Sequence, residues 1–371
     1  MSRRTDVNRR TFLRSAAAAG AVAGAGGLSG CLGFELSSND GIAGQPPIVE
    51  DRPDGVYLPS HVEGMAMGGM GEAGDYRVGV FYSYAHRFWN VNGESVERTD
   101  IESDDDVHLM ASVWDPETGE VLPETGLSVE IERDGSLVSQ EVIYPMLSQP
   151  MGTHYGANFG LDGDGTYTVN VSVGGVRTRR TGAYRDRFGD PADIPVEFEY
   201  SQSDRDEISF RTLDNAGERD AVDRMEMEMM PDATAPPVDG LPGEVLGEAN
   251  SNDAILVATV LEESPTGIDA EGPYLAVSAR TPYNRMLIPA MGLEATLSRD
   301  GDTVFSGELA RTIDPELSYH YGTALEGASV ESGDDLTLTP TVWPQVARHE
   351  GYETAFGALM GGMPERTLTV E

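Results

Sequence analysis

The tripeptide His154-Tyr155-Gly156 returns 166 positions further along the chain as His320-Tyr321-Gly322. Two segments upstream of it return at the same spacing: Gly126-Leu127 as Gly292-Leu293, and Arg133-Asp134-Gly135 as Arg299-Asp300-Gly301. Self-similarity at a fixed offset indicates one structural unit that occurs twice. The sequence therefore predicts two tandem copies of one domain.

Both copies contain short runs in which apolar and polar residues alternate, which is typical of half-buried β-strands. Turn signals such as Asp162-Gly163-Asp164-Gly165 separate the runs, and no long helical pattern interrupts them. We therefore expect an all-β fold with two tandem immunoglobulin-like β-sandwich domains. The predicted strands are 76–84, 107–114, 127–131, 167–173 and 196–200 in the first copy, and 254–261, 274–279, 293–297, 336–342 and 367–370 in the second.

The N-terminus has the features of an export signal. Arg9-Arg10 precedes the apolar, glycine-rich run 15–30, which is too short for a permanent membrane span. This pattern is similar to a twin-arginine signal, and Leu28-Ser29-Gly30-Cys31 resembles the lipobox of prokaryotic lipoproteins. We expect export, lipidation of Cys31 and attachment to the outer face of the cell membrane. Because Cys31 is the only cysteine, the mature chain would contain no disulfide and no thiolate metal ligand.

Five segments make up the predicted domain organisation. The signal is followed by a short tether, and an acidic linker rich in methionine and proline separates the two sandwiches. We expect one short helix within that linker, across 216–229. The predicted bounds are 1–31 for the signal, 32–52 for the tether, 53–200 for the metal-binding sandwich, 201–252 for the linker and 253–371 for the second, degenerate sandwich.

The charge of the chain indicates a halophilic source. The 371 residues include 63 acidic and 25 basic residues, for a net charge of -38, and none of the basic residues is lysine. Near molar salt the screening length falls to roughly 3 Å, which relieves the self-repulsion of such a chain. A hydrophobic content of 39% argues against an acidic disordered protein. The lack of a basic face argues against nucleic-acid binding.

Side chains that ligate soft metals gather in the first copy only. His108 lies on a predicted strand, Met110 follows on the same side of that strand, and Met146, Met151 and His154 lie further along the copy. Imidazole nitrogen together with thioether sulfur suits copper and tolerates iron, zinc or manganese. The sequence thus predicts a transition-metal site in the first copy. The second copy has Tyr274, Thr312 and Leu317 in place of His108, Met146 and Met151.

Several segments of the first copy also match one known family in order. They are Val56-Tyr57-Leu58-Pro59, Asp106-Val107-His108-Leu109, Pro145-Met146, His154-Tyr155-Gly156-Ala157-Asn158 and Pro195-Val196-Glu197-Phe198-Glu199-Tyr200. Together they resemble the periplasmic iron-transport (Fe²⁺ transport) protein family, over about residues 50 to 200. The resemblance implies an immunoglobulin-like, often dimeric protein that binds copper and acts beside a high-affinity iron permease.

The resemblance also assigns ligands. It implies that His108, Met146 and His154 bind the metal. The family's acidic residue two positions after the strand histidine is replaced here by Met110, and its later loop histidine has no counterpart in 176–180. The fourth ligand is therefore open, and the candidates are Met110, Met151, His61 and Glu63.

The other histidines and methionines have plainer interpretations. His86 lies beside aromatic residues and is interpreted as structural, His349 is isolated in the sequence, and His320 repeats the motif without the other ligands. The methionines of 65–70 and 225–230 are soft enough for Cu(I). Packing is the favoured interpretation, because methionine fills irregular gaps.

We therefore expect a lipid-anchored metal-binding protein that assists iron or copper uptake together with an iron permease or another membrane transporter. It is not expected to be an enzyme, because the sequence has neither a nucleophile elbow nor a phosphate-binding loop with its lysine. The alternatives are a structural or adhesive surface lipoprotein and a redox enzyme. A homodimer is possible in this family, and so is a pseudo-dimer in which the second copy supplies the partner surface within one chain.

Overall fold

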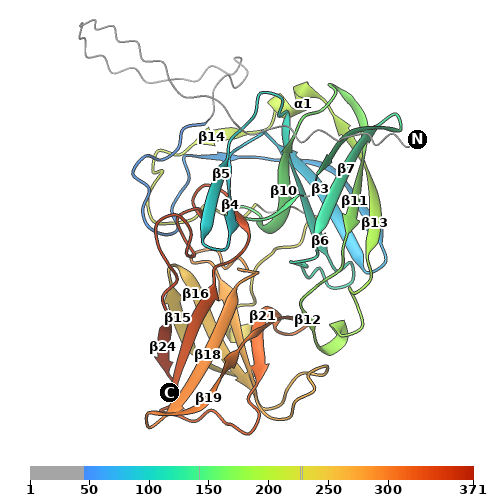
Figure 1. Ribbon diagram of the computed structural model, residues 1–371. Helices are drawn as coiled ribbons and strands as arrows, with labels where there is room; N and C mark the ends of the chain where they lie inside the picture. Colours follow the sequence, from blue (N-terminus) through green and yellow to red (C-terminus); the bar gives the residue numbers. More distant parts are fainter. Residues whose placement is uncertain (1–45, 142, 226, 228) are drawn as a thin grey trace, which may run out of the picture. The chain divides into compact units, whose positions relative to one another are not determined.

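The computed structural model describes residues 46–141, 143–225, 227 and 229–371 (Figure 1). The predicted signal, Cys31 and most of the tether lie outside these residues. Within the described residues the regular secondary structure is almost entirely β-strand, with one short helix, α1 (Gln202–Asp206), and two single 3₁₀ turns. None of the helices in this part of the chain is long and apolar enough to cross a membrane.

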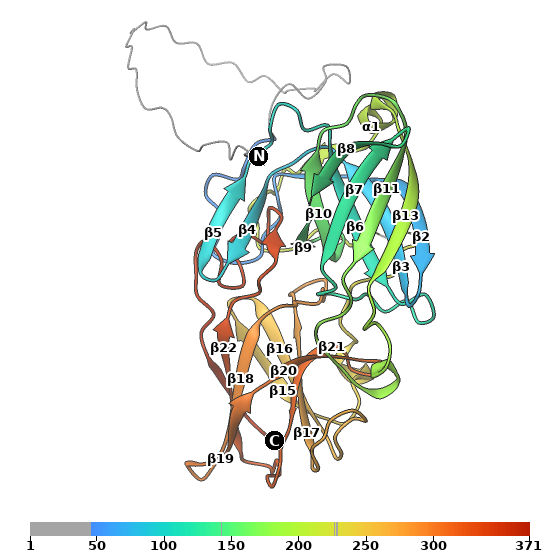
Figure 2. The ribbon, with the colours of Figure 1, turned by 45° about the vertical axis from the view of Figure 1, so that its right-hand side comes forward.

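The first copy forms a sandwich of two sheets, whose strands Figure 2 labels. Its core lies between them, where Leu109 and Val80 of one sheet meet Val129 and Val169 of the other, all fully buried. The larger sheet has the order β2 (Ala66–Ala73), β3 (Tyr76–Ser83), β6 (Val107–Trp114), β10 (Gly152–Phe159), β9 (Tyr144–Ser148), β23 (Ala347–Arg348), β4 (Phe88–Asn92) and β5 (Ser95–Thr99). The smaller has the order β13 (Ala192–Tyr200), β11 (Gly165–Val173), β7 (Leu127–Arg133) and β8 (Ser136–Glu141).

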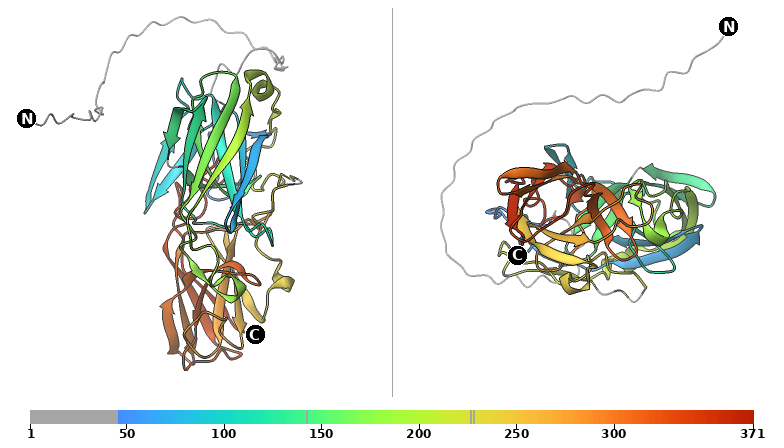
Figure 3. Two further views of the ribbon diagram at one scale, coloured as in Figure 1. Left: turned by 90° about the vertical axis from the view of Figure 1, so that its right-hand side faces the viewer. Right: turned by 90° about the horizontal axis from the view of Figure 1, so that it is seen from below.

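Apart from the hairpin β4–β5, which its described residues lack, the second copy repeats this topology, and Figure 3 gives two further views of the ribbon. The all-β prediction and the two tandem copies are therefore confirmed. One sheet has the order β15 (Glu244–Ser251), β16 (Ala254–Leu261), β17 (Tyr274–Arg280), β21 (Ser318–Ala324), β20 (Ala310–Asp314) and β12 (Arg179–Arg180). The other has the order β24 (Arg366–Thr369), β22 (Asp335–Val342), β18 (Gly292–Arg299) and β19 (Asp302–Glu308).

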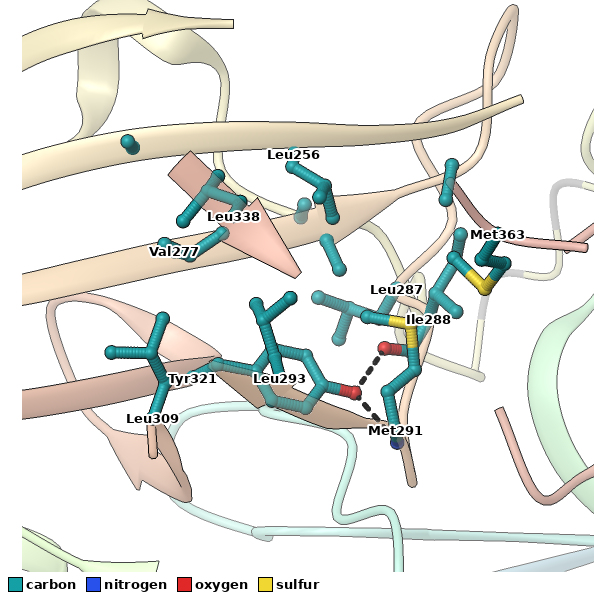
Figure 4. Packing of buried hydrophobic residues seen from close by; sticks show 14 of the residues in the cluster. Leu256, Val277, Leu287, Ile288, Met291, Leu293, Leu309, Tyr321, Leu338 and Met363 are labelled. Carbon is teal, nitrogen blue, oxygen red and sulfur yellow. Dashed lines mark hydrogen bonds between the residues drawn. The ribbon is translucent and has the colours of Figure 1, made fainter. Parts of the chain in front are cut away.

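The tyrosine of the repeated tripeptide has a structural role in both copies. In the second core Tyr321 donates a hydrogen bond to the carbonyl of Ile288 at 2.8 Å and accepts one from the amide of Met291 at 3.1 Å (Figure 4). In the first copy Tyr155 accepts a hydrogen bond from the amide of Gly126 at 3.1 Å. Each buried ring thus satisfies backbone groups of the segment that enters the opposite sheet, which explains why both copies keep the tyrosine.

Each copy contributes one short strand to the sheet of the other. β12, which lies between β11 and β13 of the first copy, runs parallel to β20, with Arg179 opposite Thr312. β23, which lies between β22 and β24 of the second copy, runs parallel to β9, with Ala347 opposite Met146, and its Arg348 pairs with Trp89 of β4. Since Met146 and Thr312 occupy equivalent positions of the repeat, the exchange is reciprocal and has pseudo-two-fold character.

The segment between the copies differs from the prediction. No helix forms across 216–229, where the described residues form turns and irregular backbone. The helix of this region is α1, which begins where Ser201 Oγ accepts a hydrogen bond from the amide of Asp204. Strand β15 falls inside the predicted linker and pairs with β16, so the second sandwich begins before residue 253. Strand β14 (Phe210–Thr212) pairs with β1 (His61–Glu63) of the first copy.

Candidate metal centre

Four imidazoles converge beside the large sheet of the first copy. The rings of His86 and His108 are stacked with centroids 4.0 Å apart, and the ring of His349 lies 5.5 Å from that of His108 and 5.2 Å from that of His154. His86, His108 and His349 each offer a ring nitrogen within 4.8 Å of those of the other two. We call these four rings, together with Met146, the imidazole centre.

Neighbouring strands bring His108, Met146 and His154 together. His108 lies on β6 and His154 on the adjacent β10, while Met146 on β9 is directly opposite His154. Gly156 leaves the space between them open, because a Cβ there would lie 2.6 Å from Nε2 of His108 and 3.1 Å from Sδ of Met146. The three side chains for which the sequence predicted a metal site thus border one small volume.

The strand exchange brings in His349, which sequence reasoning had set aside as isolated. Its backbone amide donates a hydrogen bond to the carbonyl of Leu147 at 3.1 Å, directly after β23. His349 therefore enters the centre from the second copy. In the sequence His349 stands alone, and no pattern connects it with the first copy. Only the pairing of β23 with β9 places it in the centre.

His86, which sequence reasoning had interpreted as structural, also enters the centre. It lies just before β4, the first strand of the hairpin β4–β5, which has no counterpart between β16 and β17. Asn158 fixes this segment, since its Nδ2 donates to the carbonyl of His86 at 3.0 Å. The hairpin β4–β5, which positions the ring of His86, is an insertion in the first copy. Comparing the two copies at a fixed offset therefore could not identify His86 as part of the centre.

Oxygen acceptors beside the far nitrogen favour one tautomer in three of the rings. Nδ1 of His108 lies 2.8 Å from Oδ1 of Asn158, Nδ1 of His154 lies 3.0 Å from the carbonyl of Gly152, and Nδ1 of His86 lies 3.4 Å from a carboxylate oxygen of Glu63. These oxygens can only accept, so each Nδ1 carries the proton and each Nε2 presents a lone pair. Such outer partners are typical of metal-binding histidines.

The inner nitrogens have no hydrogen-bond partner. Nε2 of His86, His108, His154 and His349 is buried in each case, and none of the four donates or accepts a hydrogen bond among the described residues. A buried polar atom without a partner costs about 1–3 kcal/mol, so four in one cluster require an explanation. A cation bound among His86, His108 and His349, whose ring nitrogens lie within 4.8 Å of one another, would satisfy three of them at once.

Burial keeps three of these imidazoles neutral, those of His108, His154 and His349. Removal from water lowers the pKa of His154 to about 4, although the hydrogen bond to Gly152 opposes the shift. The pKa values of His108 and His349 lie well below the usual 6.5, chiefly because of burial and secondarily because of the neighbouring imidazoles. A neutral ring is the form that ligates a metal.

The second copy provides an internal comparison. His320 is equivalent to His154 and its Nδ1 also lies 3.0 Å from a carbonyl, that of Ser318, but its Nε2 lies 3.0 Å from the hydroxyl of Tyr274. Tyr274 takes the place of His108. The remaining positions are hydrogen-bonded as well: Thr312, equivalent to Met146, donates to the carbonyl of Ala310 at 2.9 Å, and Thr181, equivalent to His349, donates to Asp314 at 2.7 Å.

The other predicted ligands lie around the centre. His61 and Glu63 are linked at 3.1 Å, and Glu63 acts on His86 through its outer nitrogen. Burial alone would raise the pKa of Glu63, but its hydrogen bonds to His61 and His86 outweigh burial and lower the pKa to about 2. Met110 and Met151 pack with Phe81 in a separate apolar cluster at the edge of the centre. These four residues border the same cavity as His86 and His349.

Comparison with known proteins gives a family but no activity. The model of a family described as a domain of unknown function (DUF7350) matches twice, over residues 71–194 and 239–366. Among curated proteins none matches the sequence.

Two solved structures of FetP from uropathogenic Escherichia coli are similar in part. The protein as isolated is 22% identical with a TM-score of 0.29, over 37% of this chain and 96% of that chain. A copper-bound variant of it is 21% identical with a TM-score of 0.28, over 37% of this chain and 97% of that one. At these TM-scores the likeness carries no argument about this chain.

Proposed function

Because the chain belongs to the DUF7350 family, whose description names no activity, we propose from the site itself that the imidazole centre binds one copper ion. The observation that carries the proposal is the contrast between the two copies. Four buried Nε2 atoms lack partners in the first copy, whereas the equivalent histidine of the second copy is hydrogen-bonded at both nitrogens. An apolar or purely structural role would not leave four acceptors unpaired in one copy alone.

The donor set supports copper. Imidazole nitrogens together with the thioether of Met146 are ligands that copper accepts in both of its common oxidation states. Iron accepts a thioether ligand less readily than copper does. Burial gives the centre a low dielectric, and the outer hydrogen bonds hold the rings in the ligating tautomer. When bound, copper would supply a redox-active cation at this place. The residues of the chain bind it, orient their lone pairs and keep water away.

The biological setting extends the proposal. We place the protein outside the cell membrane, anchored through Cys31, where it assists iron or copper uptake with an iron permease or another transporter. The twin-arginine pattern and the resemblance of the first copy to periplasmic iron-transport proteins support this setting. Membrane fractionation tests the anchor: the wild-type protein is expected with the membranes and the Cys31→Ser variant in the soluble fraction.

Copper titration of the full chain in molar salt tests the binding function. We expect one equivalent of Cu(II) with nitrogen hyperfine coupling in its paramagnetic resonance spectrum, and loss of that equivalent in His108→Ala and His349→Ala. His320→Ala is the matched control, since it removes a buried histidine of the same motif without touching the centre. Absence of stoichiometric binding by the wild-type protein would refute the proposal and leave a tethered pair of sandwiches with a structural or adhesive function.

A further inference from the structure

A cavity of about 790 Å³, counted with its open mouth, adjoins the imidazole centre. His86 and His349 form part of its wall, while His108 and His154 are fully buried behind them. The cavity therefore offers an ion a route from solvent to the two rings of the centre that border it. What else lines the cavity decides which ions it admits.

Three methionines line one side of the cavity. Met110 comes from β6, Met151 from the turn between β9 and β10, and Met65 from the residues just before β2. Met110 and Met151 are almost fully buried and pack on the ring of Phe81, with Met65 against them. We call Met65, Met110 and Met151 the thioether cluster.

The second copy shows that packing does not require sulfur at these places. At the offset of the repeat, Ala276 takes the place of Met110 and Leu317 the place of Met151, and these two pack with Tyr274 in an equivalent apolar cluster. Gly243 precedes β15 where Met65 precedes β2. Thioethers thus occur in the copy that has the imidazole centre and are absent from the equivalent places in the copy that lacks it. The packing role of methionine does not by itself explain why methionines occupy these positions in the first copy only.

Further methionines lead outward from the cluster. Met227 and Met230 pack against it from the segment between the copies. Met67 and Met70 of β2 are each 37% exposed. Met67 and Met70 thus present thioethers at the surface of the strand that follows Met65.

We propose that the thioether cluster is a second metal site, selective for Cu(I), through which copper passes between the surface and the imidazole centre. Three neutral sulfur donors suit a soft monovalent ion, whereas Cu(II), Fe(II) and Zn(II) prefer the nitrogen and oxygen donors found elsewhere in the cavity. The proposal rests on the proposed function only in that the cavity leads to the imidazole centre. Binding at the cluster itself is measured separately.

Anaerobic Cu(I) titration of the full chain in molar salt, against a colorimetric Cu(I) chelator, tests the site. The wild-type protein is expected to hold two equivalents of Cu(I) and one of Cu(II). The triple variant Met65→Leu/Met110→Leu/Met151→Leu is expected to hold one equivalent of each, with copper–sulfur scattering in X-ray absorption reduced. Met363→Leu, at a buried methionine in the core of the second copy, is the matched control and should behave as wild type.

Three results would overturn the inference. One is failure of the wild-type protein to hold one more equivalent of Cu(I) than of Cu(II), another is the same number of Cu(I) equivalents in the triple variant as in the wild-type protein, and the third is loss of Cu(II) in the triple variant, which would make the sulfurs part of the imidazole centre. If the triple variant unfolds, Met151→Leu alone is used, since leucine occupies this place in the second copy. Failure of the proposed function has a different signature: the wild-type protein would bind no Cu(II), but it would still bind one equivalent of Cu(I), which the triple variant would lose.

Discussion

His154 and His349 lie with ring centroids 5.2 Å apart although one belongs to each copy of the repeat. Strand β23 holds them together by pairing with β9 of the first copy, and the amide of His349 donates to Leu147. The centre is therefore complete only when the two copies are docked. This explains how a second copy that has lost most of the metal-ligating residues still contributes to the site of the first.

Removal of the histidine from the second copy tests this dependence. We expect His349→Ala to weaken Cu(II) binding by at least about 100-fold, because loss of a ligand should cost no less than loss of an outer partner. The hydrogen bond from its backbone amide remains, so the melting temperature of the apo protein should change little. Thr181→Ala at the equivalent place of the repeat is the control, and equal losses in both variants would contradict the assignment.

Removal of an outer partner should weaken the centre without deleting a ligand. Asn158→Ala releases Nδ1 of His108 and frees the segment that carries His86. We expect a loss of about 10- to 100-fold in Cu(II) affinity with one equivalent still bound. Asn90→Ala, at a half-buried asparagine of the nearby hairpin, is the control. An unchanged affinity in Asn158→Ala would show that the ring orientation does not depend on this bond.

The low pKa of the buried rings predicts a broad pH range for binding. Protons compete with copper for Nε2 only near the folded-state pKa, which is about 4 for His154. We therefore expect Cu(II) to remain bound at about pH 5.5 and to be released as the pH falls towards about 4. Release centred near pH 6.5, followed by the resonance spectrum, would show that the rings titrate as they do in water.

The same pKa shifts determine whether acid raises or lowers the stability of the metal-free protein. The folded-state pKa values of His154 and His320 are about 4, below the 6.5 of the unfolded chain. The unfolded chain then binds more protons in this window, so the free energy of unfolding should fall as the pH drops from about 6.5 to about 4. Urea unfolding at both pH values measures this. His320→Gln should reduce the slope, and an unchanged slope would contradict the assignment of His320.

The repeat also predicts that a second site can be built. Thr181, Tyr274 and Thr312 occupy the places of His349, His108 and Met146, and His320 is already present. We expect Thr181→His/Tyr274→His/Thr312→Met to raise the Cu(II) stoichiometry from one towards two, although without a counterpart of His86 the new site should be weaker. The single variant Tyr274→His is the control and should stay at one. A folded triple variant with one equivalent would show that these ligands do not suffice.

The charge of the chain predicts strong salt dependence. With a net charge of -38, raising ionic strength from about 0.1 M to about 1 M shortens the screening length from about 10 Å to about 3 Å and should raise the melting temperature by several degrees or more. Sodium and potassium chloride at equal ionic strength should act alike if screening is the cause. A melting temperature that is flat or falls over this range would contradict the halophilic interpretation.

The sandwiches could be predicted because strand periodicity and turn signals are local. The runs around His108 and Tyr274 became β6 and β17, and the tripeptides became parts of β10 and β21. The grouping of His108, Met146 and His154 was also within reach, since neighbouring strands place such residues side by side. The predicted helix across 216–229 was wrong, because local helix propensity gives little stability without the packing of a helical face, and the segment between the copies instead packs Met227 and Met230 from turns and irregular backbone.

The sequence by itself determined the duplication, the sheet-forming runs and the chemical type of the first copy's ligands, because these depend on residue identity and short spacing. Tertiary structure alone decided that His349 and His86 complete the centre. His349 is positioned by β23, which the second copy contributes. His86 is positioned by the hairpin β4–β5, which occurs only in the first copy. Contacts between residues so far apart in the chain are set by how sheets pair and pack, and no local pattern records that pairing.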